Sequence, residues 1–230
     1  MTRDEALARY QAIRPTIRRV LELAPAMCTL SDWTRAAKLL GVQDFLAEDL
    51  GITEQHYHGF LQDVALFEPN QRGTRAYDRF LKRADEVLEP AELPLARAIR
   101  RETFSVFRVA DRHEAAGIWL EDLFADNRRL WMLDEGLETN ASEGQRIATR
   151  LFDAGGFHAG LSLAVPIDDE DMDEYRRMGL TPRHRQFVPT VYGNAMFGPL
   201  MAKFDEETRT REEPGEADPS ASPEDRNSEP

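Results

Sequence analysis

The stretch TFSVFRVADRHEAAGIWLEDLF, Thr103 to Phe124, marks the point at which the chain changes from a helical to a strand-like pattern. Before it, apolar residues recur three or four positions apart, as they do along one side of an α-helix. Within it, the polar segment ADRHEA separates two short runs rich in branched and aromatic residues, TFSVFRV and AGIWLEDLF. Runs of this composition that are bounded by turn residues are typical of β-strands.

Three more runs of the same kind follow: RRLWMLDE, QRIATRLFD and HAGLSLAVP. Segments rich in glycine or charge divide them, namely ADN, GLETNASEG and AGGF, and each is expected to be a turn. Five short strands are too few for a β-sandwich but suit a small antiparallel barrel. The sequence therefore predicts a five-stranded barrel over residues 103–167, which resembles SH3-like or OB-like barrels in shape.

The region before the barrel, residues 1–102, is expected to be entirely helical. Thr2 and Glu5 have the spacing of a capping box, and so do Thr29 and Asp32, which predicts that a helix begins at each threonine. Pro15 interrupts the first apolar stripe, which predicts a kink or two short abutting helices.

After the barrel, residues 168–207 are expected to form helices that pack against it. Acidic residues begin the segment IDDEDMDEYRRMGL and arginines lie near its end, a polarity that complements the helix dipole. Residues 205–230 contain ten acidic and three basic residues, so they contribute −7 to a net charge of −13 and leave −6 for the rest. Such a segment cannot bury enough apolar surface to order itself, and we expect residues 208–230 to be a disordered acidic tail.

The composition is that of a soluble globular protein, and the fold class we predict is α+β. No apolar run approaches the roughly 20 residues that span a bilayer, and the charged N-terminus does not resemble a signal peptide. The single cysteine, Cys28, excludes an internal disulfide and any multi-cysteine metal site. These features predict a cytoplasmic protein with no membrane partner.

Residues 43–62 have the outline of a helix-turn-helix motif. Ala47 stands four residues before the turn glycine, Gly51, and apolar residues flank both. Between Gln43 and Phe67, however, there are five acidic residues and no lysine or arginine. A DNA-reading helix of this charge would be repelled by phosphates, so plain helix packing is the preferred interpretation unless folding brings arginines to its side.

The other candidate motifs all have simpler structural explanations. His56 and His58 would point in different directions on a helix, Ser162 is expected inside a strand, and Cys28 is expected to be a buried residue at a helix start. The acidic residues 168–174 lack the spacing of a calcium loop. We predict no catalytic residue, no metal and no cofactor.

Tryptophans and arginines in the predicted barrel form the candidate binding surface. Its members are Trp119, Trp131, Arg128, Arg129, Arg146 and Arg150. If they share one exposed side, they could stack single-stranded nucleic acid or grip a peptide. In the alternative interpretation, the tryptophans fill the core and the arginines are solvated edge residues.

By elimination, the sequence predicts a non-catalytic cytoplasmic binding or regulatory protein whose partner is a protein or peptide. A nucleic-acid-binding protein that uses residues 43–62 or the barrel is the first alternative, although the acidic charge disfavours it. An enzyme with a site assembled from scattered polar residues is the second.

Overall fold

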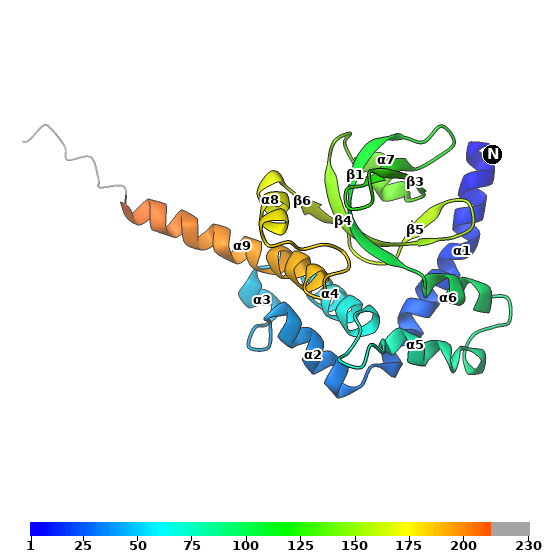
Figure 1. The fold of residues 1–230 in the computed structure, drawn as a ribbon, viewed down its shortest axis with the longest axis horizontal. Helices are drawn as coiled ribbons and strands as arrows, with labels where there is room; N and C mark the ends of the chain where they lie inside the picture. Colours follow the sequence, from blue (N-terminus) through cyan, green and yellow to red (C-terminus); the bar gives the residue numbers. More distant parts are fainter. Residues whose placement is uncertain (213–230) are drawn as a thin grey trace, which may run out of the picture.

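The computed structural model describes residues 1–212, and the side chains of residues 1–202 (Figure 1). The α+β class is confirmed: helices precede and follow a small β-barrel. The N-terminal helical region consists of α1 (Arg3–Leu23), η1 (Ala24–Met27), α2 (Leu30–Leu40), α3 (Ala47–Leu50), α4 (Glu54–Phe67), α5 (Ala76–Leu81), η2 (Ala84–Glu86) and α6 (Leu93–Ile99).

Local sequence signals fix where several of these helices begin. The capping boxes at Thr2 and Thr29 both form and start α1 and α2. The expected division into two short helices at Pro15 is wrong, because α1 is one helix of 21 residues that contains this proline, and the alternative of a kink stays a prediction.

The strands of the barrel are β1 (Thr103–Arg112), β2 (Ile118–Asp122), β3 (Arg128–Met132), β4 (Arg146–Asp153) and β5 (His158–Gly160). They follow one another in the order β1-β2-β3-β5-β4, and β4 pairs with β1 to close the ring. The prediction of a wholly antiparallel barrel is corrected at one seam, because β3 and β5 run parallel and meet at Met132 and His158. A parallel pair needs a long connection, and residues 133–157 supply it with a helix and β4.

Two further corrections concern the connections. The segment GLETNASEG contains a short helix, α7 (Glu135–Asn140), which begins where the Asp134 side chain accepts a hydrogen bond from the Leu137 amide. The last predicted strand is two strands, because β6 (Val165–Ile167) follows β5 and pairs with β4 beside it.

The chain ends in α8 (Asp169–Arg177) and α9 (Phe187–Glu212). Asp168 caps α8 and completes another capping box. Residues 208–212, predicted as the start of the tail, belong to α9, and the rest of the predicted tail lies outside the described residues. Figure 1 shows α9 leading away from the body of the molecule.

Three apolar clusters hold the helices and the barrel together. One fills the barrel, from Phe107 on β1 to Leu151 on β4. A second joins α2, α4, α8 and α9 to the outer side of β1, β4 and β6, and a third joins α1, α5 and α6 to the side that carries β5. The predicted boundaries after residues 102 and 167 fall between secondary-structure elements, but the packing continues across them.

The arginines of the N-terminal helix bind residues of the barrel region. Arg9 on α1 donates a 2.7 Å hydrogen bond to the carbonyl oxygen of Gly155, in the turn before β5. Arg3 donates a 2.5 Å hydrogen bond to the Glu138 carboxylate on α7. Figure 1 shows α1 running along this side of the barrel. Helix and barrel therefore form one packed unit.

Candidate binding surfaces of the barrel

The structure separates the six residues of the predicted surface into three locations. Trp119, Trp131 and Arg129 lie together on β2 and β3, with Arg128 at the beginning of β3. Arg146 lies at the start of β4, and its guanidinium binds Asp169 of α8 and the backbone oxygen of Asp168. Arg150 is buried, so it is not part of an exposed surface.

The two tryptophans point away from the barrel interior. They are directly opposite each other in the β2–β3 register, while the neighbouring Ile118 and Leu120 point inward and belong to the barrel core. Alternate residues of a strand point to opposite sides, so this placement follows from the pleat. Both tryptophans are half-buried, which is intermediate between the two interpretations drawn from the sequence.

A histidine that sequence analysis did not select completes this surface. His113, in the β1–β2 turn, stacks on Trp131 with 3.8 Å between ring centroids and lies 4.7 Å from Trp119. Its Nδ1 accepts a 3.0 Å hydrogen bond from the Ala115 amide, so the neutral ring carries its proton on Nε2. Burial lowers the pKa of His113 below its ordinary 6.5, which favours this neutral form.

Arg129 lies over the Trp119 ring, with its guanidinium carbon 5.1 Å from the ring centroid. The residue opposite Arg129 is Glu121, and this carboxylate is bound by Arg108 at 2.5 Å instead. The residue opposite Arg128 is Asp122, whose carboxylate accepts a 2.6 Å bond from the Ser105 hydroxyl. Within residues 1–202, neither Arg128 nor Arg129 has an ion-pair partner.

We call the group Trp119, Trp131, Arg129 and His113 the β2–β3 face. Beside it lies an open hollow of about 600 Å³, which Arg129 also lines. Side chains of both signs surround the hollow, including Arg108, Glu121 and Glu143. The β2–β3 face therefore combines an aromatic centre with a rim of mixed charge.

Arg150 points outward from β4 on the opposite side, but helix α4 covers it. Its guanidinium binds three carboxylates, at 2.7 Å to Asp63, 2.6 Å to Glu102 and 3.0 Å to Glu68. The Phe67 and Phe104 rings lie 4.9 and 5.4 Å from its guanidinium carbon. We call this group the arginine junction, because it connects α4, the start of β1 and β4.

The arginine junction has more negative than positive charge. Burial alone would lower the pKa of Arg150, but Asp63 and the other carboxylates raise it well above its ordinary value. Burial raises the pKa of Glu68, and the charge of Arg150 offsets only part of this effect. Arg75 supplies a second cation by binding Glu102 at 2.9 Å. Sequence analysis missed the three carboxylates because their spacing along the chain gives no sign that they meet.

Residues 43–62 contain two helices, α3 and α4, joined at Gly51, and the beginning of α4 is exposed. Helix α3 has four residues, and residues 63–67 of α4 are all buried among neighbouring elements. His58 binds Glu54 of its own helix at 3.1 Å, and His56 lies against Phe60. The exposed part of α4 carries no lysine or arginine.

Ser162 and Cys28, the two residues considered as nucleophiles, are both held in the packed structure. Ser162 lies between β5 and β6 rather than inside a strand, which corrects that expectation, and its hydroxyl accepts a 3.1 Å bond from the Arg150 amide. Burial raises the pKa of the Cys28 thiol to about 11. A thiol with this pKa is almost fully protonated at neutral pH and is a poor nucleophile.

The described residues hold no group of three or more His, Cys, Asp or Glu side chains placed to bind a metal ion. Along the same part of the chain, no helix is both long enough and apolar enough to cross a membrane.

These features define the class of the protein as an α+β protein built on a small mixed barrel with helices on several sides. The chain belongs to a family of unknown function (DUF7986), whose model matches residues 4–173. The matched range covers α1 through the first half of α8, and so includes the whole barrel. Comparisons with curated proteins and with solved structures gave no match.

Proposed function

We propose that this protein is a non-catalytic binding protein that recognises a protein or peptide through the β2–β3 face. The observation that carries the proposal is the position of Trp119. It points outward from the barrel, is half-buried, and belongs to none of the three apolar clusters.

The composition of the β2–β3 face supports a protein partner. Tryptophan and arginine are the residue types most enriched among the side chains that dominate protein–protein binding energy. Arg129 over Trp119 places both types at one spot. The ring of His113 stacks on Trp131 and limits the rotamer entropy that Trp131 can lose on binding.

The charge around this face supports the same partner class. Arg108 and Arg129 alternate with Glu121 across the strands, so the rim offers sites for acidic and basic groups alike. A polyanion would meet repulsion from Glu121 and Glu143 at the hollow. A peptide of mixed charge can satisfy both signs.

Site-specific photo-crosslinking tests this proposal. A photo-reactive residue in place of Asp111, which lines the hollow, should capture a partner in cells, whereas the same residue in place of Glu48 on α3 should not. For the purified partner, Trp119→Ala should raise the Kd at least tenfold, because truncation of a central tryptophan typically costs 2 kcal/mol or more.

Arg146→Ala is the matched control, because it removes a charge from the same barrel at a residue that already binds Asp169. It should leave the Kd within twofold of wild type. A partner whose affinity is unaffected by Trp119→Ala, in a variant that remains folded by circular dichroism, would refute the assignment of this face.

Single-stranded nucleic acid is the second candidate ligand, and the strand order favours it. A closed ring in the order β1-β2-β3-β5-β4 resembles OB-like barrels, which bind oligonucleotides over strands 2 and 3 and the adjoining loops. Trp119 and Trp131 lie on those strands, and His113 lies in the first of those loops.

Fluorescence anisotropy with short single-stranded DNA and RNA at two salt concentrations separates the two candidates. Binding that weakens steeply with salt and disappears in Trp119→Ala and Arg129→Ala would support nucleic acid. Duplex DNA serves as the control, because stacking on Trp119 requires unpaired bases. No binding of any probe would leave the protein partner as the candidate.

A further inference from the structure

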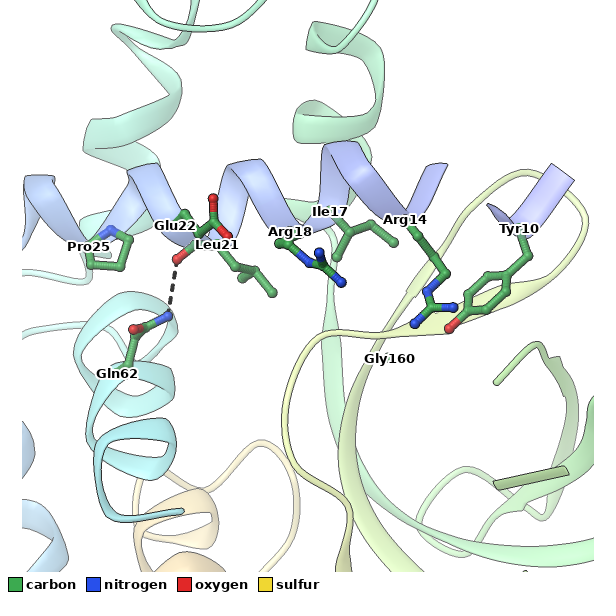
Figure 2. Close-up of a pocket in the computed structure, with 9 residues that line it drawn as sticks. All are labelled: Tyr10, Arg14, Ile17, Arg18, Leu21, Glu22, Pro25, Gln62 and Gly160. Carbon is green, nitrogen blue, oxygen red and sulfur yellow. Dashed lines mark hydrogen bonds between the residues drawn. The ribbon is translucent and has the colours of Figure 1, made fainter. Parts of the chain in front are cut away.

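A groove on another side of the molecule lies between α1, α4 and the end of β5 (Figure 2). Its volume is about 550 Å³, within the range of sites that bind small molecules. Residues of α1 form most of its lining, and Pro25 of η1, Gln62 of α4 and Gly160 of β5 complete it. The groove is separate from the β2–β3 face and shares no residue with it.

Two arginines give one end of the groove a positive charge. Figure 2 shows Arg14 and Arg18 extending from the same side of α1, with the Tyr10 hydroxyl beside Arg14. Like charges four residues apart on a helix repel each other and destabilise the helix. Arg14 lies 3.6 Å from a Glu135 oxygen, and its guanidinium carbon is 5.6 Å from the centroid of the Tyr10 ring, whereas among the described side chains Arg18 has no ion-pair partner.

On the α4 side of the groove, a hydrogen bond to α1 holds the side chain of Gln62 in place. The Gln62 amide donates a 3.2 Å bond to the Leu21 carbonyl oxygen, which joins α4 to α1 and leaves the Gln62 side-chain oxygen available to a ligand. Figure 2 shows this bond at the end of the groove away from Tyr10, near Glu22. Ile17 and Leu21 line the stretch between the two ends and supply an apolar surface.

A second, smaller hollow extends the polar end. It has a volume of about 210 Å³ and shares Leu21 and Gln62 with the groove. Asp63 and Ser162 also line it. The Asp63 carboxylate is already bound by Arg150, so the Ser162 hydroxyl is the polar group that this hollow offers, and it suits a neutral hydrogen-bonding part of a ligand.

We infer that this groove binds a phosphorylated small molecule whose phosphoryl group lies between Arg14 and Arg18 and whose organic part points toward Gln62. Guanidinium groups match phosphate oxygens in charge and in bidentate geometry. The groove is larger than inorganic phosphate requires and is of suitable size for a mononucleotide. Phosphate at this place also removes the repulsion between the two arginines.

Isothermal titration calorimetry with adenosine 5′-monophosphate, adenosine and inorganic phosphate tests the inference on the full chain. We expect saturable binding of the monophosphate, weaker binding of inorganic phosphate and none of adenosine. Arg18→Gln should weaken binding of the monophosphate at least tenfold.

Arg19→Gln is the matched control, because Arg19 is the next residue of α1 and donates to the Val87 carbonyl oxygen outside the groove. It should change the affinity less than twofold. Equal weakening by Arg18→Gln and Arg19→Gln, or no saturable heat with either phosphate compound, would overturn the inference. Inorganic phosphate that binds as tightly as the monophosphate would overturn the role given to the Gln62 end.

Crosslinking at Asp111 and the Trp119→Ala variant test the β2–β3 face, and neither residue lines the groove. Failure of the phosphate site and failure of the proposed partner surface are therefore separate results.

Discussion

Arg150 and Arg129 lie on the same barrel and have opposite environments. Arg150 on β4 is covered by α4 and binds three carboxylates. Arg129 on β3 is exposed and contacts the ring of Trp119, while the carboxylate opposite it binds another arginine. Both arginines point outward from the barrel, so the pleat alone does not distinguish them.

The difference between them is whether the chain itself neutralises the charge. At the arginine junction, intramolecular carboxylates occupy every side of the guanidinium, which leaves nothing for a partner to bind. At the β2–β3 face, the charge of Arg129 remains available. Of these two arginines, Arg129 is therefore the one that has no ion pair among the described side chains.

Of the substitutions considered, Arg150→Met should cause the largest loss of folding stability. The change leaves Asp63 and Glu68 without their cation and Glu102 with Arg75 alone, and removal of one member of a buried ion pair typically costs about 3 to 5 kcal/mol. We expect the variant to unfold at much lower urea concentration than wild type, or to be insoluble. Urea unfolding followed by circular dichroism measures this.

Arg129→Met is the control, because it makes the same chemical change on the β2–β3 face. It should alter the free energy of unfolding by no more than about 0.5 kcal/mol, as expected at an exposed position. Equal destabilisation by the two variants would show that burial of the charge does not distinguish the two regions.

Gly117→Ala should distort the backbone of the turn before β2, next to the β2–β3 face. Gly117 has a φ of 78°, and a Cβ at this position would collide with the carbonyl oxygen of Met132. A left-handed conformation costs a residue with a side chain about 1 to 3 kcal/mol, and the collision adds to it. We expect a loss of at least about 3 kcal/mol in the free energy of unfolding, measured by urea titration.

Gly144→Ala isolates the effect of the collision. Gly144 has a similar φ of 82°, but an added Cβ would meet no atom within 4 Å. Its loss should be limited to the conformational cost, roughly 1 kcal/mol. If the two alanine variants lose the same free energy of unfolding, the collision with the Met132 carbonyl oxygen does not contribute to the loss.

Glu68→Gln tests how the negative charge of one carboxylate in the arginine junction affects folding stability. Since the folded protein raises the pKa of Glu68 above its ordinary 4.5, its protonated form is favoured in the fold. The contribution of Glu68 to folding stability is therefore fully present below pH 4.5 and is lost as pH rises through the raised pKa. At pH 7 the neutral glutamine should therefore increase stability, by less than Gly117→Ala decreases it.

Thermal unfolding of wild type and Glu68→Gln at pH 7 and pH 4 measures this difference. The gain from the glutamine should be present at pH 7 and shrink toward pH 4, where wild-type Glu68 is itself protonated. A variant that is less stable than wild type at pH 7 would show that the Glu68 charge strengthens the arginine junction.

His113 should give the smallest effect, with the opposite pH dependence. Because its folded pKa is lowered from 6.5, its contribution to stability is present above pH 6.5 and is lost as pH falls through the folded pKa. Protonation also places a hydrogen on Nδ1, which can no longer accept from the Ala115 amide. Tryptophan fluorescence between pH 8 and pH 5 should report this change.

His113→Asn is the control, because the amide does not titrate in this range. The variant should lose part of the pH dependence of fluorescence, with the rest attributable to His158, whose pKa burial also lowers. An unchanged titration curve in this variant would assign the whole transition to other groups.

Local features of the fold could be read from the sequence, and non-local ones could not. The caps at Thr2 and Thr29, the strand pattern after Thr103 and the acidic start of α8 each depend on neighbouring residues alone. The parallel pairing of β3 with β5 depends on how the ring closes, and no local pattern encodes it. Helix α7 was missed because six residues are too short to show a helical period.

The candidate sites follow the same division. Strand alternation places Trp119 and Trp131 on one side once the β2–β3 register is known, and β2 and β3 are neighbours in the chain. The burial of Arg150 depends on Asp63, 87 residues away, and on which side of β4 the helices cover. Composition could therefore indicate an aromatic and basic surface, but it could not separate the buried arginine from the exposed one.

The hydrogen bond between Arg9 and Gly155 joins residues 146 positions apart. At roughly 5 to 20 residues per second, a ribosome makes the β5 turn on the order of ten seconds after α1. Throughout that interval the apolar side of α1, with Ala6, Tyr10 and Ile17, has no barrel to pack against. Packing of this side against α5 and α6 can begin earlier, but the contacts of the earliest helix with the barrel form only once almost the last strand has been synthesised.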